Sequence, residues 1–121
     1  MPPVLNLKTK VKTARFAETR AFYQELFDLP VAEEWDEPGD KGVILRAGAD
    51  GFLEIYEGDI DDPDAYRALS LQFRVPDVHA FADAIRGKWP TEGPKARPWG
   101  STYLYLRDPN GVLVIVFEGG L

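Results

Sequence analysis

Very few side chains in this sequence could act as catalysts or metal ligands. The 121 residues include one histidine and no cysteine. This excludes disulfide scaffolds, zinc fingers, thiol enzymes and, within one chain, any site built on two histidines. The histidine, His79, lies in a helical pattern and is expected to be a solvated surface residue. Ser70, Ser101 and Thr102 have no histidine at a plausible distance along the fold, so nucleophilic catalysis is not predicted.

Aromatic side chains, by contrast, recur on one face of several expected strands. Strand side chains alternate between the two faces of a sheet, and the apolar set must pack on a helix. The opposite faces then carry Phe52, Glu54 and Tyr56 in one strand, Gln72 in a second, and Tyr103, Tyr105 and Arg107 in a third. A large exposed apolar patch is unusual in a monomer. Either the other half of the chain or a second subunit covers these faces, or they form a ligand pocket with aromatic walls.

The strands that carry these side chains belong to an internal repeat. Ile55-Tyr56-Glu57-Gly58 and Val116-Phe117-Glu118-Gly119 have the same apolar-aromatic-Glu-Gly pattern, about half the chain apart. At a similar offset, the alternating segment 7–11 resembles the segment 69–75, and each leads into a helical pattern. The sequence therefore predicts two copies of one structural unit.

Each copy is predicted to run strand, helix, strand, strand, strand. In the first half we expect strands at 6–12, 31–35, 43–47 and 52–57, with a helix at 16–27. In the second half we expect strands at 69–75, near 95, at 102–107 and at 112–118, with a helix from 76 to about 88. An acidic linker, 59–68, joins the halves. The prediction is an α+β fold: one domain over 1–121, made of two tandem β-α-β-β-β units at about 5–58 and 69–119.

Composition narrows the class of protein further. Twenty acidic side chains against 14 basic ones give a formal charge of −6, which disfavours nucleic acid as a partner because phosphate binding needs a basic face. No apolar run approaches the length of a membrane span, and the first seven residues do not have the pattern of a secretion signal. We therefore expect a soluble, cytoplasmic protein with neither a membrane nor a nucleic-acid partner.

The paired units resemble the vicinal oxygen chelate superfamily, which contains glyoxalase I, extradiol dioxygenases, fosfomycin-resistance enzymes and bleomycin-resistance proteins. The segments that carry the resemblance are Ala21-Phe22-Tyr23, Leu26-Phe27-Asp28-Leu29-Pro30, Val75-Pro76-Asp77-Val78 and Arg107-Asp108-Pro109-Asn110-Gly111-Val112-Leu113. The resemblance covers essentially the whole chain. It implies curved mixed sheets around a cleft and a homodimer, in which the two units pair within one chain or swap across the dimer.

The resemblance also tells which positions would hold a metal ion. Metal enzymes of this superfamily take one His or Gln from the first strand of each unit and one Glu from the last strand of each. The corresponding positions here are Lys8, Ser70, Glu54 and Ile115. Only Glu54 could bind a divalent cation, and one carboxylate is too few for catalytic zinc, iron or magnesium. We expect no metal and no cofactor, and Glu54 and Lys8 are candidates for a buried ion pair.

The metal-free branch of the superfamily resembles this chain better. Bleomycin-resistance proteins are small acidic dimers that sequester an antibiotic without altering it, and Trp99-Gly100-Ser101-Thr102 is similar to their tryptophan-glycine-x-threonine pattern. Trp35 lies in the matching loop of the first unit. Acidic residues around Trp35 and in the linker could attract a basic drug, although ordinary solvation explains such residues equally well. These residues are Glu33, Glu34, Asp36, Glu37 and Asp40, with Asp59, Asp61, Asp62 and Asp64 in the linker.

The sequence therefore favours a metal-free binding protein that sequesters a hydrophobic or aromatic natural-product antibiotic, and no catalytic residue is assigned. The predicted ligand-binding residues are Trp35, Arg46, Phe52, Glu54, Tyr56, Gln72, Trp99, Tyr103, Tyr105 and Arg107. The alternative is a divergent glyoxalase-like lyase or isomerase that acts on a small carbonyl compound, with Glu54 as general base and Lys8 as its electrostatic partner. A third interpretation is that the cleft serves dimerisation alone.

Overall fold

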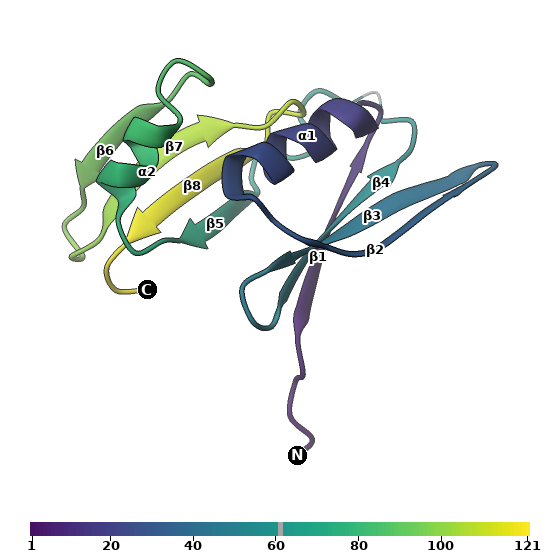
Figure 1. Ribbon diagram of the computed structural model, residues 1–121, viewed down its shortest axis with the longest axis horizontal. Coiled ribbons are helices and arrows are strands. Elements are labelled where there is room, and N and C mark those ends of the chain that lie inside the picture. Colours follow the sequence, from purple (N-terminus) through teal and green to yellow (C-terminus); the bar gives the residue numbers. More distant parts are fainter. Residues whose placement is uncertain (61) are drawn as a thin grey trace. The chain divides into compact units, whose positions relative to one another are not determined.

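The protein forms an α+β fold with two four-stranded mixed sheets (Figure 1). The computed structural model describes residues 1–60 and 62–121, so Asp61 of the acidic linker lies outside the described residues. The described chain divides into two compact units, Met1–Asp62 and Pro63–Leu121. Within it, no helix is long and apolar enough to cross a membrane.

Unit one, Met1–Asp62, has the predicted order of elements. These are β1 (Leu7–Thr13), α1 (Phe16–Phe27), β2 (Val31–Glu37), β3 (Asp40–Ala47) and β4 (Gly51–Glu57). The strand order is β1-β4-β3-β2, with β1 parallel to β4 and the other pairs antiparallel. The β2–β3 hairpin extends past the other strands of its sheet (Figure 1).

The helix α1 begins and ends at the predicted residues, and its C-terminal end carries a local stop signal. Asp28 adopts the left-handed conformation, with φ of 52°, and its N–H donates to the Gln24 carbonyl, which closes the helix just before Pro30. One helix face packs on β3 and β4. Tyr23 on α1 and Leu45 and Ile55 on those strands are completely buried and form the core of this unit.

Unit two, Pro63–Leu121, repeats the same topology. Its elements are β5 (Ser70–Arg74), α2 (Val78–Ala84), β6 (Glu92–Ala96), β7 (Thr102–Arg107) and β8 (Leu113–Glu118). The strand order is β5-β8-β7-β6, with β5 parallel to β8. Leu104 and Leu106 are buried on the helix side of the sheet, as predicted, with Val114 and Val116. His79 is exposed on α2.

The second helix is shorter than the sequence predicts. We expected it to continue to about Lys88, but it ends at Ala84 and residues 85–88 form turns. Gly87 has φ of +81°, a conformation that an α-helix cannot continue through. The shortened helix α2 packs on β6, β7 and β8. Leu69, which we expected in the core, precedes β5 and stays exposed at 38%.

Candidate functional site

The predicted residues of unit one share the sheet face that points away from α1. Arg46 of β3 pairs with Phe52 of β4. Trp35 of β2 pairs with Gly42, which in turn pairs with Tyr56. The neighbouring strand positions, such as Leu53 and Ile55, are buried in the core, so Phe52, Glu54 and Tyr56 must point to the opposite face.

Trp35 is held over this face by contacts that could not be predicted from the sequence. Its ring lies directly over Gly42, in the space that a side chain at that position would fill. Its Nε1 donates to the Asp40 Oδ1 at 2.9 Å, and its ring centroid is 6.5 Å from that of Tyr56. Asp40 is therefore a positioning residue for Trp35, and sequence reasoning considered it only as part of an acidic rim.

Asp40 also acts on Tyr56. The side-chain hydrogen bond to the Asp40 carboxylate raises the pKa of Tyr56, and smaller contributions come from burial and from the negative charges of Asp40 and Glu54. The phenol consequently keeps its proton to a higher pH than a free tyrosine does. In the folded protein the Tyr56 hydroxyl is a neutral hydrogen-bond donor throughout the physiological range.

We expect the Asp40→Asn variant to lower the pKa of Tyr56 toward the ordinary tyrosine value, because it removes the hydrogen bond to a carboxylate and, with it, the carboxylate charge. A ¹³C NMR titration of labelled tyrosine from pH 8 to 12 measures this. The stabilisation from the raised pKa is fully present below the unfolded pKa of about 10, and the wild-type protein should lose it as pH rises through the folded value. An unchanged Tyr56 titration in the variant would contradict the assignment.

Glu54 is the most deeply buried charged residue of this face. It is 6% exposed, and its Oε1 lies 3.1 Å from the Lys8 Nζ while its Oε2 lies 3.6 Å from the Lys10 Nζ. The ion pair with Lys8 was predicted and is confirmed. The second partner, Lys10, was missed, although it pairs directly with Glu54 in the β1–β4 register.

These contacts bear on whether Glu54 and the other three family ligand positions could hold a metal ion, as they do in the metal enzymes of the superfamily. Both oxygens of Glu54 are taken by ammonium groups, and Lys8, Ser70 and Ile115 offer no suitable donor set. Across residues 1–60 and 62–121, no three His, Cys, Asp or Glu side chains gather as a metal site requires. The donor set does not fit a resident metal ion.

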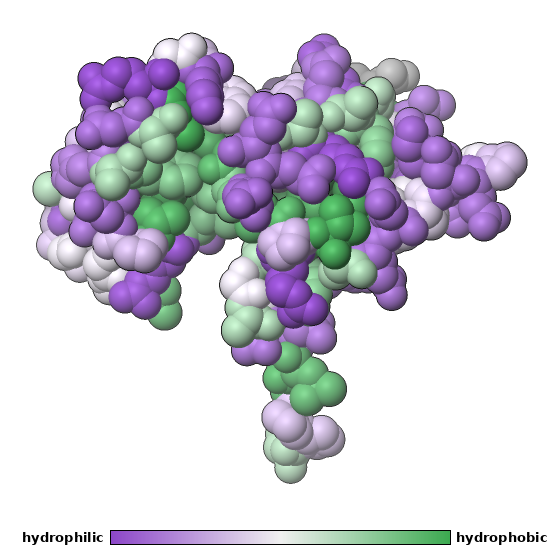
Figure 2. Space-filling model, in the orientation of Figure 1, coloured by the Kyte–Doolittle hydropathy of each residue, from purple (hydrophilic) through white to green (hydrophobic). Residues whose placement is uncertain are grey.

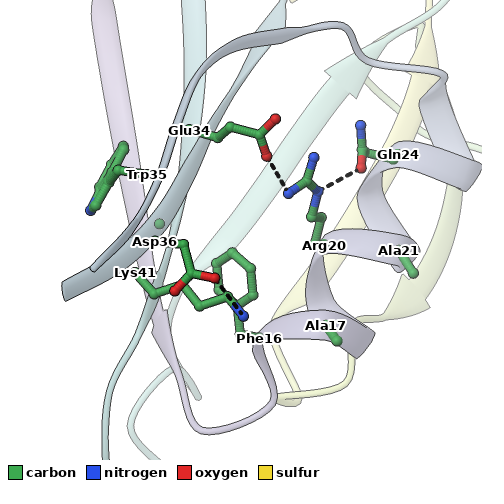
Figure 3. A pocket seen from close by; sticks show the side chains of 10 residues that line it. Phe16, Ala17, Arg20, Ala21, Gln24, Glu34, Trp35, Asp36 and Lys41 are labelled. Carbon is green, nitrogen blue, oxygen red and sulfur yellow. Dashed lines mark hydrogen bonds and ion pairs between the residues drawn. The ribbon is translucent and has the colours of Figure 1, made fainter. Parts of the chain in front are cut away.

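The other side of the β2–β3 hairpin faces α1 across a pocket of about 510 Å³ (Figure 3). There Arg20 of α1 donates to Glu34 at 2.7 Å and to Gln24 at 2.9 Å, and Lys41 pairs with Asp36 at 3.8 Å. Trp35 is also among the residues that line this pocket, but Figure 3 shows its ring pointing away from Arg20. The acidic stretch around Trp35 is thus divided between two faces, and part of its charge is neutralised by pairing.

The predicted residues of unit two gather around Tyr103. Its ring centroid lies 5.5 Å from that of Trp99, 5.9 Å from Tyr105 and 5.6 Å from Phe117. Its hydroxyl lies 3.3 Å from the Gln72 Oε1, to which it donates. Sequence reasoning missed Phe117, which belongs to this cluster because the β7–β8 register pairs it with Tyr103.

Two cations extend the aromatic cluster of unit two. The Arg97 guanidinium lies 5.0 Å from the Trp99 ring centroid and the Lys95 ammonium 6.0 Å from that of Tyr105. Arg107 donates to the Gly111 carbonyl at 3.0 Å and lines, with Tyr105, a pocket of about 570 Å³ at the β6–β7 side of the sheet. The structure thus brings the predicted residues together as two groups, one on each sheet.

Several solved structures share this fold. A bleomycin-binding protein in complex with bleomycin is 25% identical, with a TM-score of 0.68, over 92% of this chain and 95% of the other. A lactoylglutathione lyase from Agrobacterium tumefaciens is 24% identical, with a TM-score of 0.71, over 98% and 96%. TnmS3, an antibiotic binding protein from Streptomyces sp. CB03234, is 19% identical, with a TM-score of 0.77, over 99% of each chain.

No curated protein sequence matches this chain. The family model described as the Glyoxalase/Bleomycin resistance protein/Dioxygenase superfamily matches residues 9–116, nearly the full length of both β-α-β-β-β units. The match agrees with the repeated topology, with the Asp108-Pro109-Asn110-Gly111 hairpin and with the solved structures of the same fold. The chain belongs to the glyoxalase/bleomycin resistance protein/dioxygenase superfamily.

Proposed function

We propose that this protein binds an aromatic small molecule, of the kind represented by natural-product antibiotics, and sequesters it without chemical change. The observation that carries the proposal is that each sheet turns a face rich in aromatic rings away from its helix. Relatives that are named for bleomycin binding and antibiotic binding support it. Sequestration requires only affinity, and the proposal involves no cofactor.

The physical basis of binding is stacking. Tyrosine and tryptophan rings offer large rigid contact areas at low cost in side-chain entropy, and a planar conjugated ligand can lie against several of them together. In unit two the walls of the proposed binding site are Trp99, Tyr103 and Tyr105. Trp99 is 55% exposed, so its ring has surface that a ligand can cover. Gln72 and Arg107 supply the polar groups that orient the ligand.

The alternative, a lyase or isomerase with Glu54 as general base, has less support. A general base must present a free carboxylate oxygen within hydrogen-bond reach of the substrate proton. Here each oxygen of Glu54 is ion-paired with an ammonium group, one with Lys8 and the other with Lys10, and Glu54 is only 6% exposed. We assign Glu54 to ligand binding and to the support of the sheet, because the pair fixes the two lysines beside the aromatic rings.

The proposal includes a homodimer. The N-terminal tail exposes apolar side chains, visible as green atoms at the bottom of Figure 2, with Val4 88% and Leu5 78% exposed. Such residues on an extended segment next to the edge strand β1 suit contact with a second copy. Light scattering coupled to size-exclusion chromatography should give twice the monomer mass, and the Val4→Ser/Leu5→Ser variant should shift it toward monomer.

The proposed binding is tested with a panel of aromatic antibiotics by isothermal titration calorimetry. Each compound that binds is then recovered from the complex and analysed by mass spectrometry. We expect at least one compound to bind and to be recovered with unchanged mass. Conversion of a bound compound would favour the enzyme, and loss of that turnover in Glu54→Gln would assign the base.

For a compound that binds, we expect Trp99→Ala to weaken binding by about tenfold or more, because an exposed indole that stacks on the ligand contributes on the order of 1–2 kcal/mol. Trp99→Phe keeps an aromatic ring and should retain most of the affinity. Calorimetry is the readout, so that loss of indole fluorescence does not confuse the result. Equal affinity of wild type and Trp99→Ala would remove Trp99 from the site.

A further inference from the structure

A row of cations crosses the aromatic face of unit one. Lys8, Lys10 and Lys12 occupy alternate positions of β1, so they point to the same face as their respective β4 partners Phe52, Glu54 and Tyr56. On the other side of β4, Arg46 of β3 pairs with Phe52. Phe52 therefore lies between two cations, Lys8 and Arg46, in one row across the sheet.

The cations of this face lie against the aromatic rings themselves. The Arg46 guanidinium lies 4.8 Å from the centroid of the Phe52 ring, and the Lys10 ammonium lies 4.3 Å from that of Tyr56. The side chains of Lys8 and Lys10 are 47% and 52% exposed. A planar ligand on this face would therefore contact positively charged groups that lie over the rings as well as the rings themselves.

Cations outnumber carboxylates around Phe52. The Phe52 row contains two cations and no carboxylate, and Glu54 in the next row is shared by Lys8 and Lys10. The carboxylates of the β2–β3 hairpin lie toward the other end, where Asp40 holds Trp35. The corresponding row of unit two has Ser70, Leu113 and Arg107, with a single cation, so the doubled positive charge is specific to unit one.

We propose that the ligand is an aromatic anion, and that its carboxylate, sulfonate or phenolate group lies in the Phe52 row between Lys8 and Arg46. This rests on the proposed function and specifies its ligand class. It is opposite in sign to the basic drug that the overall charge of −6 suggested. The local charge decides the sign, because Lys8, Lys10 and Arg46 outnumber the single carboxylate of Glu54 around this row, and charges more than about 8–10 Å away are largely screened at physiological salt.

Two probes with the same ring system test the proposal. They are 8-anilinonaphthalene-1-sulfonate, which is anionic, and N-phenyl-1-naphthylamine, which lacks the sulfonate. By fluorescence titration we expect the anionic probe to bind at least about fivefold more tightly at low salt, and Lys8→Met/Arg46→Met to reduce that affinity by about fivefold to tenfold. The affinity of the neutral probe should change by less than about twofold, because stacking does not need the charges.

Two control variants complete the experiment. Arg86→Met/Lys88→Met removes the same two charges from an exposed turn of unit two and should alter neither affinity. Phe52→Ala should weaken both probes, since both stack on that ring. Circular dichroism melting of each variant verifies that it is folded before its affinity is interpreted.

The outcomes separate this inference from the proposed function. If the neutral probe binds as tightly as the anion and Lys8→Met/Arg46→Met changes neither, the anionic ligand class is wrong while aromatic binding stands. If neither probe binds the folded wild-type protein, aromatic binding by this face is itself overturned. Loss of the anionic probe alone in Lys8→Met/Arg46→Met supports both.

Discussion

The Lys8→Met/Lys10→Met variant should lose about 2–3 kcal/mol of the free energy of unfolding, because it leaves Glu54 as a buried carboxylate without a counter-charge. Glu54 is 6% exposed and depends on these two ammonium groups for its neutralisation. The loss is smaller than for a fully enclosed pair, since both lysine side chains are about half exposed and water can partly replace them. Urea unfolding followed by circular dichroism measures it.

Adding Glu54→Ile to that variant should restore most of the lost stability. Unit two already has this neutral solution at the corresponding positions, where Gln72 pairs with Ile115. Replacing a buried ion pair by an apolar side chain of similar volume is often neutral or stabilising. Lys88→Met/Lys95→Met, which removes an exposed ion pair with Glu92, should cost less than about 1 kcal/mol. A triple variant no more stable than the double variant would show that the lysines stabilise the sheet by other contacts.

Much of the fold could be predicted because the decisive signals are local. The repeated apolar-aromatic-Glu-Gly pattern predicts two equivalent units, and the structure has the same strand order in both. Helix α1 carries its stop signal at Asp28 and Pro30, and strand β7 alternates cleanly between core and surface. These features depend on residues within one element, which is what a single sequence makes visible.

The second helix was predicted too long because the prediction used the local spacing of apolar residues and took no account of tertiary packing. Phe81 and Ile85 continue the helical spacing, but Gly87 adopts a positive φ and the chain turns after Ala84. Glycine weakens a helix only by about 1 kcal/mol relative to alanine, so its effect depends on whether tertiary contacts favour continuation. That balance cannot be read from the sequence alone.

The sequence predicted which residues line the candidate site, and the structure shows which other residues each of them contacts. Lys8 and Glu54 were paired correctly because the family resemblance placed both at ligand positions, one on the first and one on the last strand of the unit. Lys10 and Asp40 were missed as partners, since their contacts follow from the parallel register of β1 with β4 and from the turn of the β2–β3 hairpin. These contacts change the charge expected at the aromatic face, which is the property that selects a ligand.

The hairpin between β7 and β8 depends on one buried carboxylate. Asp108 is 5% exposed, and its Oδ1 accepts from the backbone N–H groups of Asn110 at 2.7 Å and Val112 at 3.0 Å. The Gly111 N–H donates to the Asp108 carbonyl, and Gly111 has φ of +82°, which suits glycine. The aspartate-proline-asparagine-glycine pattern that supported the family resemblance is therefore a structural device that aligns the strand carrying Tyr103.

We expect Asp108→Ala to reduce the free energy of unfolding by about 2–3 kcal/mol, because it removes a charged acceptor and leaves the buried Val112 N–H without its partner. Asp108→Asn keeps one oxygen and should lose less. Asp50→Ala, at an exposed position of the β3–β4 turn, is the matched control and should lose less than about 0.5 kcal/mol. Urea unfolding ranks the variants. Equal stability of Asp108→Ala and Asp50→Ala would mean that the strand register alone holds the hairpin, and Asp108 would then have no part in positioning the aromatic wall.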